Sequence, residues 1–141
     1  MGLEELEGQE GKIEQLEEQG EEAEEELEQA EQRLQNLENA VSELQNDQEI
    51  AETLESNKQE ANEQKEEAES KRDEIIEQAE DIISEMDEMD AENESSLATL
   101  NDLESDGENV SEGKSIVEER KRTIEDIRGR AENIISRLRG H

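Results

Sequence analysis

The sequence has no cysteine, no proline and no aromatic residue, and only 14 of its 141 residues are basic against 46 acidic ones. Without cysteine the chain has no disulfide, no thiol nucleophile and no thiolate metal site. With 28% hydrophobic residues and no aromatic side chain, it also lacks what a conventional globular core needs to offset chain entropy. The residues that are present are strong helix formers, so long helices and disorder are the two alternatives.

Long hydrophobic runs are missing as well. No run approaches the roughly 18 apolar residues of a membrane span, and the first residues lack the positive and apolar regions of a secretory signal. We therefore expect a cytoplasmic protein. The formal net charge is -32, with glutamate the dominant acid and arginine more frequent than lysine. Either a halophilic adaptation or solvated glutamate-rich helix faces would produce this composition.

Hydrophobic spacing favours helices over disorder. From residue 13 the apolar positions advance by alternating steps of three and four, which predicts a coiled-coil helix over about 13–45. The first eleven residues, with Gly8 and Gly11, are expected to be a frayed lead-in. The first seam consists of Ile13, Leu16, Gly20, Ala23, Leu27, Ala30, Leu34, Leu37, Val41 and Leu44.

The phase of this pattern breaks near 45–48 and resumes in a second helix over 48–103. One interpretation is a three-residue stammer in a continuous rod. The other is a tight turn, with Asn46 and Asp47 ending one helix and capping the next, which makes an antiparallel hairpin. The hairpin is slightly favoured. The second seam consists of Ala51, Leu54, Lys58, Ala61, Lys65, Ala68, Arg72, Ile75, Ala79, Ile82, Met86 and Met89.

A basic column interrupts the second seam, because Lys58, Lys65 and Arg72 share one heptad position. A parallel dimer would set like charges against each other there, whereas a hairpin would place the column beside an acidic first helix. Long side chains that extend to solvent from a weak stretch of seam are the simpler explanation. The acids expected to accept the charge in a hairpin are Glu21, Glu22, Glu24, Glu25, Glu26 and Glu28.

A glycine-containing acidic loop is predicted over 104–113. Its sequence resembles the first half of an EF-hand calcium loop, but position 12 of that motif, which should be glutamate, is Gly113. We therefore expect an ordinary loop without metal. A last helix is predicted over 115–139, with Ser115 and Glu118 as a capping box and Gly140 as C-cap.

The charge is divided unequally between these segments. Residues 114–141 carry eight basic and five acidic side chains, a net charge of +3, which leaves -35 for residues 1–113. Opposite fields steer segments together, so the last helix should lie against the acidic body or a second copy. The acidic body argues against a nucleic-acid arm, and the same field with no Trp or Phe argues against a membrane anchor.

The sequence thus predicts an all-α protein: acidic coiled-coil helices at 1–103, a loop at 104–113 and a basic amphipathic helix at 114–141. Neither His141 nor any carboxylate belongs to a catalytic or cofactor-binding pattern, so we expect a non-enzymatic scaffold, adaptor or assembly protein. It would bind a protein partner or itself through helices. The alternative is an acidic mimic or chaperone of a basic protein. The expected contact residues are Leu27, Leu34, Leu37, Val41, Leu44, Ile75, Ile82, Met86, Ile124, Ile127, Ile134 and Leu138.

Overall fold

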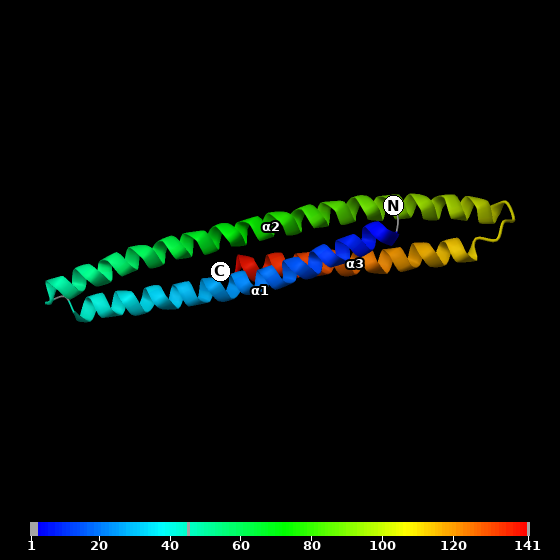
Figure 1. Ribbon diagram of the computed structural model, residues 1–141. Coiled ribbons are helices and arrows are strands. Elements are labelled where there is room, and N and C mark those ends of the chain that lie inside the picture. The colour runs from blue at the N-terminus through cyan, green and yellow to red at the C-terminus, as the bar shows by residue number, and fades with distance from the viewer. Residues whose placement is uncertain (1–2, 45, 141) are drawn as a thin grey trace.

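A computed structural model describes residues 3–44 and 46–140, which form three helices and, within those ranges, no strand. Helix α1 runs over Leu3–Glu43, α2 over Gln48–Ser105 and α3 over Ser111–Arg139. The first two helices form an antiparallel hairpin, and α3 returns along α2 in the same direction as α1 (Figure 1). Each helix packs against the other two. The predicted helical hairpin with a docked third helix is therefore confirmed.

The helices overlap unequally because α2 is much longer than its two partners (Figure 1). It has 58 residues, compared with 41 in α1 and 29 in α3. Helix α1 covers the end of α2 nearest the hairpin turn, and α3 covers the opposite end. All three helices run side by side only in the middle of the rod. The ends of the rod are therefore two-helix segments.

The hydrophobic core follows the heptad seams of the three helices. Leu6, Ile13 and Leu27 of α1 are almost completely buried, as is Met86 of α2. Helix α3 contributes Ile124, Ile127 and Leu138 to the same core. Full burial of one such side chain contributes about 1.5–3 kcal/mol, whereas a helix of this polarity has little stability alone. The narrow apolar stripes are thus what hold the rod together.

The turn between α1 and α2 uses the residues that the sequence suggested. The Asp47 amide donates to the Leu44 carbonyl at 3.0 Å, and the Asp47 side chain accepts from the Ile50 amide at 3.4 Å. Asp47 is thereby the N-cap of α2. The continuous rod with a stammer is wrong. Helix α1 ends at Glu43, slightly before the predicted 45, a position that lies outside the described residues.

The predicted frayed lead-in is also wrong, since α1 begins at Leu3 and its first turns are packed. Leu6 is only 2% exposed, and the buried Gln9 donates its side-chain amide to Glu85 on α2. Positions 6, 9 and 13 continue the spacing of three and four. Gly8 and Gly11 are exposed, so they reduce helix propensity without disturbing the packed face.

The second connection is shorter than predicted and α3 begins earlier. Helix α2 continues to Ser105, and Gly107 adopts a left-handed φ of 92° that favours glycine. Helix α3 starts at Ser111, so Ser115 lies inside it and the predicted capping box is wrong. Instead, the Asn109 side chain accepts from the Ser111 amide at 3.2 Å. Gly140 does cap α3, with a right-handed φ of -72°.

Candidate helix-binding surfaces

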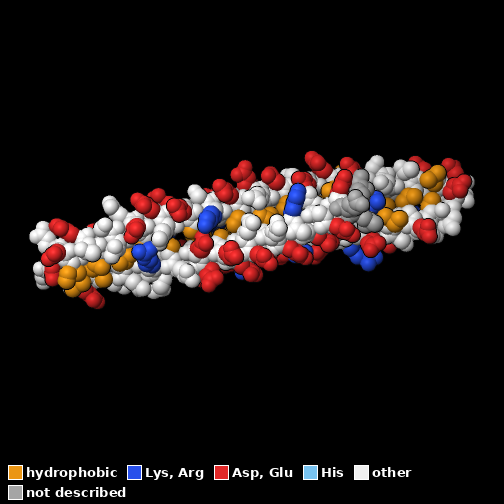
Figure 2. Space-filling view, viewed as in Figure 1, with side chains coloured by type: hydrophobic (Ala, Val, Ile, Leu, Met, Phe, Trp, Pro, Cys, Tyr) orange, Lys and Arg blue, Asp and Glu red, His pale blue; other side chains and the backbone are white. Residues whose placement is uncertain are grey.

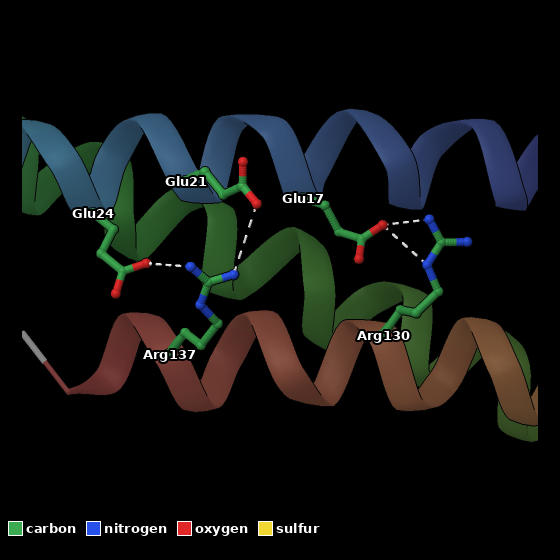
Figure 3. Close-up of polar contacts among 5 residues, drawn as sticks. All are labelled: Glu17, Glu21, Glu24, Arg130 and Arg137. Atoms are coloured by element: carbon green, nitrogen blue, oxygen red, sulfur yellow. Dashed lines mark hydrogen bonds and ion pairs between the residues drawn. The ribbon is translucent and has the colours of Figure 1, made fainter.

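The clearest binding surface in the molecule is the one that α1 presents to α3 (Figure 3). The Arg130 guanidinium donates from Nε to Glu17 Oε1 at 3.0 Å and also through Nη2. One heptad later, Arg137 Nη2 donates to Glu24 Oε2 at 2.9 Å and its Nη1 lies 3.9 Å from Glu21 Oε1. The hydrogen bond with Glu17 raises the pKa of Arg130. Both helices thus repeat the contact at an interval of seven residues.

The two ion pairs flank an apolar contact. Gly20 of α1 is buried against α3, and a Cβ at this position would meet the side chains of Ile134 and Leu138. On the other side of α3, Arg139 pairs with Glu80 of α2 at 2.8 Å and Arg128 with Asp87 at 3.1 Å. The basic last helix therefore lies against the acidic body, as the charge division predicted.

The basic column lies on the part of α2 that α3 does not reach, since the end of α3 pairs with Glu80. Lys58 Nζ lies 3.8 Å from Glu38 of α1, and Arg72 Nε lies 3.0 Å from the neighbouring Asp73. The side chains of Lys58 and Arg72 are 31% and 19% exposed. In this stretch the aliphatic parts of the long side chains lie along the seam, and their charged ends extend to solvent. Three of the six predicted acids pair with other cations: Glu26 with Lys71 at 3.6 Å, and Glu21 and Glu24 with Arg137 of α3.

The predicted contact residues fall into three groups. Leu37 and Val41 are half-buried, and Leu44 is 38% exposed because α1 ends just before it and the chain turns away. Leu44 is thus not part of the packed seam. That these residues bind a partner stays a prediction. The others are buried within the rod: Leu27, Leu34, Ile75, Ile82, Met86, Ile124, Ile127, Ile134 and Leu138.

A second surface is a shallow groove between α1 and α2 on the side away from α3, which we call the α1–α2 groove. It consists of three consecutive hollows, none of them lined by a residue of α3. Adjacent hollows share their edge residues, and each is one heptad long. The floor is apolar, and amide and charged side chains form the rims. The floor residues are Leu16, Ala23 and Ala30 of α1 with Ala68, Ile75 and Ile82 of α2.

The apolar floor continues to the hairpin turn, where it becomes more exposed. Figure 2 shows hydrophobic side chains in a line along the rod and a denser group at the hairpin end. Leu44 and Ile50 are 38% and 45% exposed there, beside the half-buried Leu37 and Leu54. We call these four residues the hairpin-end patch. Sequence reasoning missed Ile50 because it lies one residue before the second seam begins.

The opposite end of the rod also exposes three large aliphatic side chains, those of Leu97 and Leu103 of α2 and Ile116 of α3. Their exposed fractions are 36%, 41% and 42%. Sequence reasoning missed these residues as well, although Leu97 and Leu103 continue the apolar content of α2 beyond the predicted seam. Both two-helix ends of the rod thus expose large aliphatic side chains.

Other site types have little support in the described part of the chain. Residues 3–44 and 46–140 contain no cluster of three or more side chains arranged to hold a metal ion. No described helix is long and apolar enough to cross a membrane. Comparisons with protein-family models, curated proteins and solved structures give no match for this chain.

Proposed function

We propose that this chain is a non-enzymatic coiled-coil adaptor or assembly protein that acts through helix–helix contacts with another protein. The observation that carries the proposal is the apolar surface left uncovered at both two-helix ends of the rod. In a chain with only 28% hydrophobic residues, five large aliphatic side chains among the described residues stay at least 36% exposed. Grouped apolar patches rimmed by polar residues are typical of protein interaction sites.

A photo-crosslinking amino acid at Leu44, Leu103 or Glu63, introduced in separate variants, tests this proposal in the cells that make the protein. Leu44 and Leu103 are exposed leucines at the two ends of the rod, and Glu63 is an exposed residue of α2 in none of the hollows. We expect irradiation to give adducts of discrete mass from Leu44 or Leu103 and none from Glu63. Absence of adducts at both Leu44 and Leu103, or equal labelling at Glu63, would contradict the proposal.

The acidic surface supports a second candidate, a mimic or chaperone of a basic protein. Residues 1–113 carry a net charge of -35, and the body already binds one basic helix, α3, through Glu17 and Glu24. The two candidates differ in their response to salt. A contact made by exposed acidic faces should weaken steeply between 0.1 and 1 M salt, where the screening length falls from about 10 to about 3 Å. An apolar contact at the exposed leucines and isoleucines of the rod ends should persist.

A further inference from the structure

Helix α3 meets the hairpin through a charge pattern that repeats every heptad. Four arginines of α3 pair with acids of the other two helices, and Figure 3 shows the pairs with α1. If α3 moved by one heptad, about 10 Å, in either direction, each arginine would meet another acid of the same row. The ion pairs therefore hold α3 against the hairpin without choosing its position along it. The two rows, each spaced by seven residues, are Glu10, Glu17, Glu24 and Glu31 on α1 and Asp73, Glu80, Asp87 and Glu94 on α2.

The apolar stripe of α3 repeats at the same interval. Its buried residues spaced by seven are Val117, Ile124, Ala131 and Leu138. Neither charge nor hydrophobicity therefore distinguishes the observed register of α3 from one displaced by a heptad. We propose that the register is set instead by three contacts that have no equivalent one heptad away. They are made by Asn93, Gly20 and Gly113, and we call them the register contacts.

The first register contact is a buried hydrogen bond. Asn93 of α2 is 2% exposed, and its Nδ2 donates to the Val117 carbonyl of α3 at 3.0 Å. The same heptad position of α2 holds Met86 and then Ala79, neither of which has a side chain that donates a hydrogen bond. In a displaced register the Asn93 amide would lose this acceptor. A single buried amide is a known means of specifying register between packed helices.

The second register contact is a close approach of α3 to Gly20 of α1. A Cβ atom at Gly20 would lie 3.6 Å from Ile134 Cγ2 and 3.9 Å from Leu138 Cδ1. One heptad to either side, the same face of α1 carries Ile13 and Leu27, which are almost completely buried. Side chains of that size leave no room for Ile134 and Leu138 to pack as they do beside Gly20.

The third register contact is at Gly113, near the start of α3. A Cβ atom there would lie 2.7 Å from Leu100 Cδ2, so the Leu100 side chain of α2 lies directly against the glycine. If α3 moved one heptad away from the hairpin turn, Arg120 would take the place of Gly113, and its long side chain would displace Leu100. The three contacts thus act near both ends of α3.

The experiment moves two register contacts by one heptad toward the hairpin turn. The exchange variant combines G20L with L27G, which moves the close approach, and M86N with N93M, which moves the amide. Every chain also carries R72A, because the Arg72 side chain lies along the seam just beyond the end of α3. Residues 106–110 leave enough chain for α3 to follow, since an extended segment of that length spans about 17 Å.

The readout is the distance between two nitroxide labels, measured by double electron–electron resonance. The labels are attached at S56C on α2 and S136C on α3, both exposed positions, and the chain has no other cysteine. Ser56 lies toward the hairpin turn, so in the exchange variant we expect one distance that is shorter by about 10 Å. Dilution with unlabelled chain removes distances between copies, and circular dichroism verifies that the helices remain.

A second variant tests the same inference without building a new set of contacts. G20L/N93M removes two of the three contacts, so we expect two distances, the original one and one about 10 Å shorter. G11L/A91N is the matched control, because it introduces a leucine and an asparagine at exposed positions and should leave the distance unchanged. A chain that keeps the register contacts but has glutamine at its paired arginines should also keep the original distance. Those positions are Arg128, Arg130, Arg137 and Arg139.

Three results would overturn the inference. An unchanged single distance in the exchange variant would show that these contacts do not set the register. A broad distribution or a loss of helix in both the exchange variant and G20L/N93M would show that they keep α3 docked or folded without choosing its position. A shortened distance in the glutamine variant would assign the register to the ion pairs.

Discussion

Replacing Gly20 with alanine should stabilise the rod, and the size of the effect tests how α3 is docked. Gly20 lies inside α1 and is buried against α3. A Cβ atom at this position would lie 3.6 Å from Ile134 Cγ2 and 3.9 Å from Leu138 Cδ1. These are ordinary van der Waals distances, so the methyl group should fit without displacing either side chain.

Two contributions set the expected magnitude. A glycine in a helix interior is about 1 kcal/mol less favourable than an alanine. Burial of the added carbon against α3 contributes at most about 0.8 kcal/mol more. The free energy of unfolding should therefore rise by about 1–2 kcal/mol. In a chain near this length each kcal/mol raises Tm by about 2–4 °C.

The assay is thermal and urea unfolding followed by circular dichroism at 222 nm, with Gly11→Ala as the matched control. Gly11 is an exposed residue of the same helix, and its Cβ would meet nothing within 4 Å, so only the propensity gain of about 1 kcal/mol applies. The difference between the two variants measures the contact with α3. If G20A stabilises the chain less than G11A does, the methyl group clashes and α3 is not docked in this register.

The remaining predictions concern the core, a buried polar residue and the ion pairs, and urea unfolding measures each. Ile127→Ala should lose about 2–5 kcal/mol because it leaves a cavity, whereas Leu44→Ala should change stability by less than about 0.5 kcal/mol; similar losses would contradict the assigned burial. Asn93 is 2% exposed and its side-chain amide donates to the Val117 carbonyl of α3 at 3.0 Å, so Asn93→Ala should destabilise the chain by about 1–3 kcal/mol; an unchanged Tm would show that this bond contributes nothing. Arg137→Gln should cost less than about 1 kcal/mol, and the cost should vanish in 1 M salt; a loss unaffected by salt would show that the ion pair is not responsible.

The heptad pattern was sufficient to predict the helices and most of the core. Regular steps of three and four identified Leu27, Leu34 and Ile127 as packed residues, because only one stripe of each helix can be buried in so polar a chain. The turn followed from Asn46 and Asp47, which compete for backbone hydrogen bonds. Local signals of this kind can be read without knowledge of the other helices.

The wrong predictions share a physical cause, because each concerned a segment whose structure depends on contacts with another helix. Gly8 and Gly11 indicate a frayed start, but Leu6 and Gln9 are held by the rest of the bundle and extend α1 to Leu3. Helix α3 begins at Ser111, and its N-cap residue, Val110, is a buried apolar residue that makes no capping hydrogen bond of its own. Packing compensates for weak local signals at both helix starts. The α1–α2 groove could not be predicted either, because it depends on which side of the hairpin α3 occupies.

The basic column of α2 occupies the heptad position that α3 covers farther along the same helix. In the three-helix segment the same heptad position holds Ala79 and Met86, both fully buried under α3. A lysine there would be a buried unpaired charge, which costs far more than an apolar residue. Beyond the end of α3 the position changes to Arg72, Lys65 and Lys58, whose stems lie along the exposed seam in place of a third helix. Long basic side chains therefore cover this face of the hairpin where the third helix ends.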